Sequence, residues 1–257
     1  MANIIITGAN QGIGYYMTEK LLIDGNKVSV LDIETDSFEK LKKQYSNSLI
    51  YHKVDLRSYD EVKTAVDKTA AEFGTFDIAV HNACKCTFES EADTDFDTYK
   101  DVFEVNYFGA LRFVKSVVPY MSMQKKGKVI FTSSAVGVTG FVNISPYSST
   151  KGALEALAKC LRIEYAKDNI TFHIMHPPLT RTKSASPLPV PDEFKALPEK
   201  VGYELAKHIN SKRFIICHSL NQKMQIMSCY LFPIKMGDLL SKLTANCTET
   251  EKRNDIK

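Results

Sequence analysis

Residues 3–14 read NIIITGANQGIG, an apolar run of strand type that leads into three closely spaced glycines, Gly8, Gly12 and Gly14. The residues that follow, 16–22, have the pattern of an amphipathic helix. A strand, a glycine-rich turn and a helix in this order form the context in which a dinucleotide-binding loop works. The glycines let the backbone turn tightly and approach a pyrophosphate, which rests on the N–H groups at the start of the helix. The spacing is Gly-x-x-x-Gly-x-Gly, and a glycine-rich stretch by itself is also consistent with a plain turn.

Apolar strand candidates and helical stretches alternate along the rest of the chain, as in a parallel sheet covered by helices. The further strand candidates are residues 27–31, 49–54, 78–81, 128–132, 171–175 and 214–217. The helical stretches include residues 60–73, 98–121 and 148–165. No repeat or linker interrupts the pattern, so we predict one α/β domain over residues 1–244, with a doubly wound parallel sheet of about seven strands flanked by helices. Right-handed crossovers would bring four residues to one edge of this sheet: Gly8, Asn82, Ser134 and Pro177.

Tyr147 and Lys151 lie four residues apart, and Ser134 precedes the tyrosine by thirteen residues. If residues 146–151 are helical, the two side chains share a face and the ammonium lies beside the phenol. An unperturbed tyrosine titrates at about 10, and a neighbouring cation lowers that pKa, so that the phenolate can serve as a base. Ser134 can then hold a substrate oxygen close to the tyrosine. Tyr-x-x-x-Lys alone occurs by chance in many helices, so the prediction depends on its combination with the glycine-rich loop.

In this order and at this separation, the two motifs resemble those of the short-chain dehydrogenase/reductase family, from Asn3 to about Thr182. The resemblance implies a Rossmann-type fold and a nicotinamide cofactor. It implies catalytic roles for Asn106, Ser134, Tyr147 and Lys151, with Asn106 holding a water molecule in the proton relay. It also implies that the cofactor is bound by Gly8, Asn10, Gln11, Gly12, Ile13, Gly14, Asp55, Leu56, Asn82, Ala83, Tyr147, Lys151, Pro177, Thr180 and Thr182.

The choice of cofactor can be argued from the charge of Asp32, which follows the second strand candidate. Its carboxylate can accept hydrogen bonds from both hydroxyls of an adenosine ribose, whereas a 2′-phosphate would be repelled. Members of the family that prefer NADP usually carry a basic residue just after this position or just before the second loop glycine. Those places hold Ile33 and Gln11, which we expect to border the cofactor. A carboxylate that caps the next turn is the alternative; we predict NAD as the cofactor and alcohol oxidation as the working direction.

These features predict an NAD-dependent oxidoreductase that interconverts a secondary alcohol and a ketone. Tyr147, as a phenolate, would take the hydroxyl proton while hydride leaves the carbon, and Ser134 would steady the developing carbonyl oxygen. Lys151 would lower the pKa of Tyr147 and hold the nicotinamide ribose. The alternatives are an NADPH-dependent ketone or acyl-chain reductase and a non-catalytic, nucleotide-sensing protein. Asp32 argues against the first alternative, and the presence of the whole catalytic set argues against the second.

The substrate region departs from the family pattern. Cys84 stands where a glycine is expected, and we expect its side chain to pack beside the cofactor; Pro178 replaces another glycine and stiffens its loop. Residues 183–200 are predicted to be a short, proline-rich substrate loop. The remaining candidate substrate residues are mostly apolar, which favours a steroid-like or lipid-derived alcohol or ketone, as in a hydroxysteroid dehydrogenase: Cys86, Val136, Phe141, Ile144 and Leu179.

Residues 220–244 form an apolar C-terminal segment in place of the family's usual short strand. One interpretation is a helix pair that packs on the core or on a dimer partner. The others are a flap over an elongated substrate and a weak membrane-surface contact through residues 223–243. Residues 245–257 are predicted to be a polar, frayed tail.

Composition agrees with a soluble enzyme. The chain has 257 residues and a net charge of +3, which gives no reason to expect nucleic-acid binding. No apolar run approaches the roughly 20 residues that span a bilayer, and the first strand leaves no room for a signal peptide, so we expect a cytoplasmic location. The six cysteines form no Cys-x-x-Cys pair, and we expect no metal site. The resemblance implies a homodimer or homotetramer formed through residues 98–121 and 148–165.

Overall fold

The computed structural model describes residues 1–254 and has a seven-stranded parallel sheet at its centre. In the spatial order β3-β2-β1-β4-β5-β6-β7, the strands are β3 (Leu49–Lys53), β2 (Lys27–Asp32), β1 (Asn3–Thr7), β4 (Ile78–His81), β5 (Gly127–Thr132), β6 (Ile170–His176) and β7 (Ile215–Cys217). The chain begins at the middle of the sheet, extends it to one edge with β2 and β3, and then crosses over to build the other half. The predicted doubly wound α/β fold is therefore confirmed.

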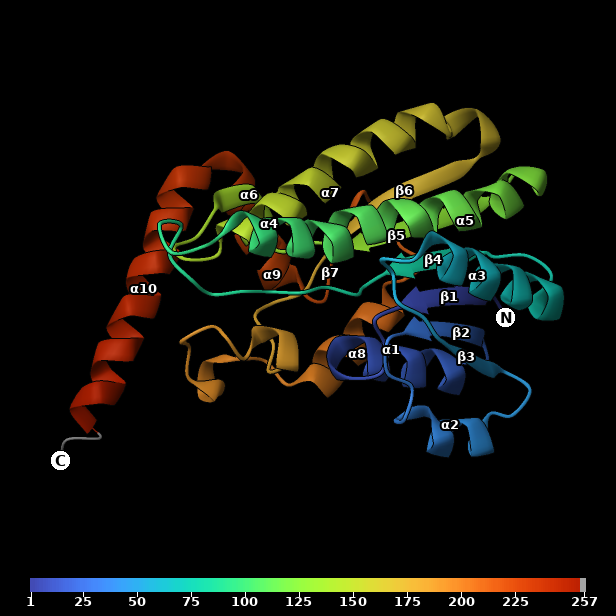
Figure 1. Cartoon of the computed structure of the whole chain (residues 1–257), viewed down its shortest axis with the longest axis horizontal. Coiled ribbons are helices and arrows are strands. Elements are labelled where there is room, and N and C mark those ends of the chain that lie inside the picture. Colours follow the sequence, from blue (N-terminus) through green and yellow to red (C-terminus); the bar gives the residue numbers. More distant parts are fainter. Residues whose placement is uncertain (255–257) are drawn as a thin grey trace.

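Helices cover both faces of the sheet (Figure 1). One face carries α1 (Gly12–Ile23), α2 (Phe38–Gln44) and α8 (Pro198–Lys207), and the other carries α3 (Tyr59–Phe73), α5 (Gly109–Met123) and α7 (Ser145–Glu164). The helix α4 (Phe96–Phe103) packs against α7. The short α6 (Val136–Thr139) and the C-terminal helices α9 (Leu220–Leu231) and α10 (Pro233–Asn254) lie beyond the carboxyl ends of the strands (Figure 1). No helix within residues 1–254 is both long enough and apolar enough to cross a bilayer.

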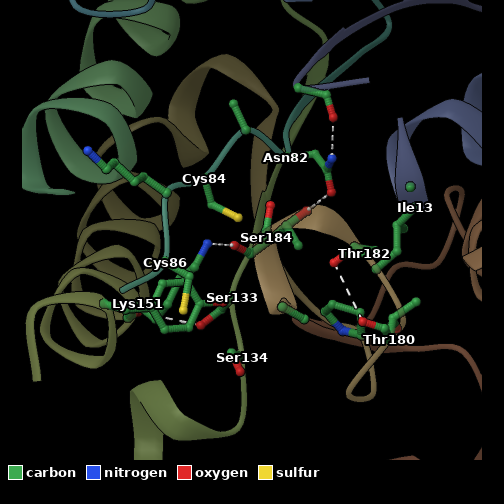
Figure 2. Close-up of a pocket in the computed structure, with 18 of the residues that line it drawn as sticks. Ile13, Asn82, Cys84, Cys86, Ser133, Ser134, Lys151, Thr180, Thr182 and Ser184 are labelled. Carbon is green, nitrogen blue, oxygen red and sulfur yellow. Dashed lines mark hydrogen bonds between the residues drawn. The ribbon is translucent and has the colours of Figure 1, made fainter. Parts of the chain in front are cut away.

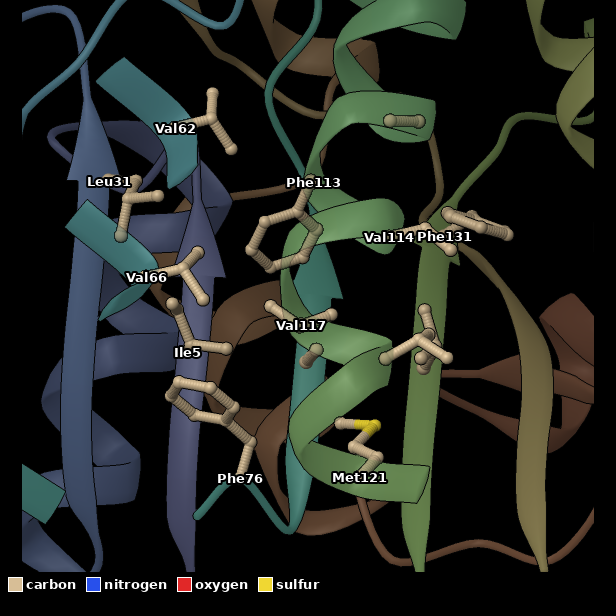
Figure 3. Packing of buried hydrophobic residues seen from close by; sticks show 14 of the residues in the cluster. Ile5, Leu31, Val62, Val66, Phe76, Phe113, Val114, Val117, Met121 and Phe131 are labelled. Carbon is tan, nitrogen blue, oxygen red and sulfur yellow. The ribbon is translucent and has the colours of Figure 1, made fainter. Parts of the chain in front are cut away.

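The two faces of the sheet have separate apolar cores because side chains alternate along each strand. In β1, Ile5 belongs to the core under α3 and α5, where it lies near Val66 and Phe76 (Figure 3). Its neighbours Ile4 and Ile6 point to the opposite face and belong to the core under α1 and α8. Strands that are buried on both sides require continuous apolar runs, which is why β1 has three consecutive isoleucines.

The helical stretch predicted over residues 98–121 is interrupted. Between α4 and α5 the backbone forms a π-helical turn, Glu104–Phe108. Turns of this kind are uncommon and occur frequently at functional sites. The turn contains Asn106, which is fully buried.

The predicted substrate loop and the two C-terminal helices follow β6 and β7 in the chain. The predicted substrate loop contains two single 3₁₀ turns, Lys183–Ala185 and Asp192–Phe194, and returns so that Thr180 pairs with Ala196. α9 begins at Leu220 and is capped by Ser219, whose side chain accepts a hydrogen bond from the backbone N–H of Gln222. Residues 245–254, expected to be a polar tail, continue α10 as a helix. Residues 255–257 lie outside the described residues.

Candidate active site

A cavity of about 600 Å³ opens at the carboxyl ends of the strands. Its walls come from the turn between β1 and α1, from residues that end or follow β2 to β6, from α7, and from α9 and α10. The four residues predicted to converge at this edge all line it: Gly8, Asn82, Ser134 and Pro177. The order of the strands reverses between β1 and β4, and ligands of such sheets bind at this kind of crossover point.

The β1–α1 turn provides a backbone cradle. Gly8 and Gly12 have positive φ angles of 67° and 61°, which L side chains rarely adopt. A side chain at Gly8 would also collide with the backbone of Ala83, since an added Cβ would lie 2.3 Å from its Cα. α1 begins after Gln11 without a side-chain cap, so its first N–H groups are free to bind an anion. These features fit the pyrophosphate of a dinucleotide.

Asn82 connects the cradle to the catalytic side of the cavity. Its side-chain Nδ2 donates a hydrogen bond to the carbonyl of Gly8 at 2.6 Å, and its Oδ1 accepts one from the hydroxyl of Thr132 at 3.2 Å (Figure 2). The ends of β1, β4 and β5 are therefore held together by one amide side chain. Sequence analysis predicted that Asn82 lies beside the cofactor, and the structure places it in the cavity lining.

The predicted catalytic trio meets in this cavity. Ser134 follows β5, and Tyr147 and Lys151 lie one turn apart near the start of α7. Ser134 and the Tyr147 phenol line the same cavity. The Lys151 ammonium donates to the carbonyl of Thr132 at 2.8 Å and lies 5.3 Å from the centre of the Tyr147 ring. Gly137 makes this packing possible, because a Cβ there would come within 2.6 Å of the Lys151 Cβ.

The pKa of Tyr147 is raised well above its usual value. Burial is the main cause, nearby Cys84 and Cys86 act in the same direction, and Ser134 opposes them. Burial also lowers the pKa of Lys151. The Lys151 ammonium lies over the Tyr147 ring and binds a carbonyl, and its effect on the Tyr147 pKa stays a prediction. Because the Tyr147 pKa is raised, the phenol carries its proton at neutral pH.

Asp32 lies at the other end of the cavity, next to the cradle. Its Oδ2 accepts a hydrogen bond from the backbone N–H of Asn10 at 2.8 Å, and its Oδ1 accepts one from the N–H of Glu34 at 3.2 Å. Burial raises the pKa of Asp32, and these backbone donors oppose the rise. The carboxylate is thus held rigidly at the cavity surface.

Comparisons with known proteins agree with this geometry. A model of the short chain dehydrogenase family matches residues 2–190. The chain belongs to this family. Oxidoreductase UcpA from Salmonella typhimurium is 32% identical over 224 residues, which cover 81% of this chain and 80% of UcpA. Fatty acyl-CoA reductase from Acinetobacter baylyi is 25% identical over 272 residues, covering 97% of this chain and 89% of that protein.

The structural comparison supports the fold of this short-chain dehydrogenase. A solved short-chain dehydrogenase from Streptomyces avermitilis superposes with a TM-score of 0.79 at 22% sequence identity, covering 99% of this chain and 98% of that one. Solved structures of this fold include complexes with NADH and with NADP. Proteins with this fold therefore bind a nicotinamide cofactor, and both forms of the cofactor occur among them.

Three predicted site residues of this short-chain dehydrogenase lie outside the cavity lining. Asn10 uses its side chain to hold the next loop, because its Nδ2 donates to Asp36 at 2.9 Å and its Oδ1 accepts from the N–H of Ser37 at 3.1 Å. Gly14 packs α1 against the strand, since an added Cβ would lie 2.4 Å from the carbonyl of Gly8. Both residues shape the cradle without lining it.

Asn106 is the third of these residues. Its side-chain Oδ1 accepts from the backbone N–H of Lys85 at 2.7 Å, and its Nδ2 donates to the Lys85 carbonyl at 2.9 Å and to the Thr150 hydroxyl at 3.0 Å. The amide thereby clamps the loop that carries Cys84 and Cys86 onto α7. In this structure Asn106 positions the site, and its contact with a water molecule stays a prediction.

The other predicted residues line the cavity. On the cofactor side they are Gln11, Ile13, Ile33, Asp55, Leu56, Ala83, Thr180 and Thr182, and on the substrate side Cys86, Val136, Phe141, Ile144 and Leu179. In Figure 2, Cys84 and Cys86 approach from one side, and Ile13 and Thr182 from the other. Burial raises the pKa of Cys86 to about 12, so this thiol stays protonated and is unreactive.

The sequence did not identify Arg57 or the individual side chains of α9 and α10 as part of the cavity lining. Arg57 forms an ion pair with Asp55 at 2.7 Å and also reaches Asp101 at 3.4 Å. No spacing rule singled it out, although it lies only two residues after Asp55. The side chains of α9 and α10 were foreseen only as a segment, and those that line the cavity are Gln222, Gln225, Ile226, Leu240 and Thr244.

Proposed function

We propose that this short-chain dehydrogenase is an NAD-dependent oxidoreductase that interconverts a hydrophobic secondary alcohol and its ketone. The observation that carries the proposal is the position of Asp32 in the wall of the same cavity that contains the catalytic trio. Its carboxylate can accept hydrogen bonds from the ribose hydroxyls of NAD and would repel a 2′-phosphate. The flanking side chains, Gln11 and Ile33, carry no positive charge to offset that repulsion.

The chemistry of the trio follows from its protonation. A nicotinamide cofactor would accept or supply the hydride. Tyr147, protonated at neutral pH, is ready to donate its proton to a ketone oxygen, and alcohol oxidation requires that proton to leave first. Ser134, in the wall of the same cavity, stabilises the charge that develops on the substrate oxygen. Lys151, bound to the Thr132 carbonyl, contributes a buried positive charge next to the phenol ring.

The apolar cavity wall opposite the cradle supports the proposed class of substrate. Apolar side chains from the proline-rich loop and from both C-terminal helices line it, including Leu188, Val190, Ile226 and Leu240. An extended apolar molecule would fill this space, whereas a sugar would find few partners. Fatty acyl-CoA reductase is similar to this chain over most of its length, which supports a lipid-derived substrate.

The NADPH-dependent alternative rests on Arg57, a cation in the cavity wall. Its guanidinium is already paired with Asp55 and Asp101, so its charge is not free for a phosphate. The non-catalytic alternative is disfavoured because Ser134, Tyr147 and Lys151 meet in one cavity.

A fluorescence titration with NADH and NADPH, performed separately, tests the proposal. The wild-type protein should bind NADH at least about tenfold more tightly, a difference of about 1.4 kcal/mol. Asp32→Ala should reduce or abolish this preference because the repulsion of the 2′-phosphate is removed. Glu34→Ala is the matched control. It also removes one negative charge, only two residues from Asp32, but the Glu34 side chain lies outside the cavity lining. A preference of the wild-type protein for NADPH would refute the assignment.

A further inference from the structure

A buried polar cluster joins the catalytic helix to the C-terminal helices, below the floor of the cavity. We call it the Glu155 cluster; its members are Ser133, which directly follows β5, and Glu155, His176 and Tyr230, from α7, β6 and α9. Glu155 Oε1 accepts from the Ser133 hydroxyl at 3.1 Å and lies 3.0 Å from His176 Nε2. Glu155 Oε2 accepts a hydrogen bond from the Tyr230 hydroxyl. The carboxylate therefore has a donor from each of three different segments.

The cluster lies at the end of two matching rows of side chains. On α7, Tyr147, Lys151 and Glu155 are spaced by four residues and share one helix face. On α9, Gln222, Ile226 and Tyr230 have the same spacing. The first two residues of each row line the cavity, and the third residues meet each other in the cluster. The contact between Glu155 and Tyr230 thus connects the wall of the substrate chamber to the helix that carries the catalytic groups.

The charge of Glu155 makes this connection specific. Burial raises the pKa of Glu155, but the hydrogen bonds from His176, Tyr230 and Ser133 outweigh burial and hold the pKa below its usual value. Glu155 is only 4% exposed, so it is a buried carboxylate whose charge depends on its donors. His176 donates through Nε2, and its buried Nδ1 has no hydrogen-bond partner among the described residues. Removing a hydrogen-bond donor from a buried carboxylate costs folding free energy. The Tyr230 hydroxyl is therefore held firmly in its position beside Glu155.

We propose that Tyr230 is a positioning residue for the substrate: by binding Glu155 it fixes α9, so that Gln222 and Ile226 form the far wall of the chamber. This inference rests on the proposed function. Ser133, next to the catalytic Ser134 in the chain, is held by the same carboxylate. The cofactor cradle lies elsewhere, in the turn between β1 and α1, and does not depend on this contact.

Tyr230→Phe tests the inference because it removes one hydroxyl and keeps the ring. With NAD as cofactor and a series of secondary alcohols from isopropanol to testosterone, the variant should raise KM for the large alcohols by about fivefold or more, as expected for losing a hydrogen bond to a charged group. The KM for isopropanol, the kcat values and the affinity for NADH should stay within about twofold. Tyr120→Phe is the matched control, since its hydroxyl donates to a carboxylate, Asp67, at 2.7 Å and lies outside the cavity lining.

A double-variant cycle separates positioning from general loss of packing. Glu155→Gln removes the charge and keeps the shape, so Tyr230→Phe should change KM much less in that background than in the wild type. Independent sites would instead give additive effects. If Tyr230→Phe does not accumulate as folded protein, Glu155→Gln alone should raise KM for large alcohols selectively.

Hydrogen–deuterium exchange distinguishes a failure of this inference from a failure of the proposed function. Tyr230→Phe should accelerate exchange in residues 220–231 and leave α5 unchanged, whether or not any alcohol is turned over. If no alcohol is oxidised but α9 exchanges faster, the proposed function fails and the role of Tyr230 in holding α9 stands. Unchanged KM and unchanged exchange would overturn the inference, as would equal changes in Tyr120→Phe.

Discussion

Tyr147 is a partly buried phenol, and the Lys151 ammonium lies over its ring, 5.3 Å from the ring centre. Its raised pKa has a direct consequence for the direction of catalysis. A group that is protonated at neutral pH is a proton donor, which suits ketone reduction, and it must lose its proton before it can act as a base. The phenolate that the spacing from Lys151 predicts stays a prediction, and the pH dependence of catalysis can test it.

The pH profile tests this protonation state. Because the pKa of Tyr147 is raised, kcat/KM for alcohol oxidation should rise by up to about tenfold for each pH unit and should still be rising at about pH 9. Ketone reduction should show the opposite sign, being level near neutrality and falling only at alkaline pH. Initial rates in both directions, measured in buffers of constant ionic strength, check the prediction. A plateau in oxidation that begins near neutral pH would show that the pKa is lowered.

Gly8 and Gly25 offer a matched pair for testing the cradle. Both have positive φ angles, but an added Cβ meets nothing within 4 Å at Gly25 and meets the Ala83 backbone at Gly8. Gly25→Ala should lower the free energy of unfolding by about 1–2 kcal/mol, the cost of a left-handed alanine. Gly8→Ala should lower it by about 3 kcal/mol or more, since the steric clash adds to that cost. Urea unfolding of both variants measures the difference; equal losses would show that the close approach is unimportant.

At this scale, the sequence was informative wherever a motif has a fixed spacing. The trio and the loop glycines could be predicted because helix geometry and backbone sterics connect spacing to position. The roles of Asn10 and Asn106 could not, since both depend on neighbours far along the chain, such as Asp36 and Lys85. The protonation of Tyr147 depends on burial, which no local pattern encodes.

At the scale of elements, α9 combines two different faces. Its inner face reaches the cavity, while large apolar side chains with helical spacing lie exposed on its outer face: Leu220, Met224, Met227 and Leu231. Residues 220–231 contain Lys223 and no acidic residue, and Lys235 follows shortly after. An exposed apolar stripe with basic neighbours is typical of a weak contact with an anionic membrane surface.

Vesicle binding tests that contact. Vesicles containing phosphatidylserine should sediment part of the wild-type protein at low salt. Met224→Ser combined with Leu231→Ser should reduce the bound fraction about tenfold or more, because two exposed apolar side chains that would enter the membrane surface are lost. Ile163→Ser is the control, as it removes an exposed apolar side chain from α7. Binding that is equal in all three proteins would argue against the contact.

The strands were predicted almost completely because each is a short apolar run between turn residues. The π-helical turn and the length of α10 were not, for different physical reasons. A π turn is rare and adds only one residue to a helix, so the hydrophobic spacing of one short stretch is too little to reveal it. The polar residues after Thr244 resemble a tail in composition, and only the structure shows that they continue α10.

At the scale of the whole molecule, strand order places the site. The crossover between β1 and β4 could be inferred from alternating elements and handedness, so the position of the cavity followed from the sequence. The cavity wall formed by α9 and α10 could not be placed from the sequence, because within residues 1–254 no strand follows these helices to fix their position on the sheet. The surfaces expected to form a homodimer or homotetramer expose Phe108 and Ile163, and the oligomer stays a prediction.

The walls of the cavity come from residues as distant in sequence as Gly8 and Thr244. Unfolding either end of the chain would therefore dismantle the binding site, so any molecule that occupies it must oppose the unfolding of the whole protein. A ligand at a hundred times its Kd would add about 2.7 kcal/mol to the free energy of unfolding. The melting temperature is thus a general reporter for this pocket, and a library of alcohols, ketones and nucleotides can be ranked by heat alone, before any reaction has been found.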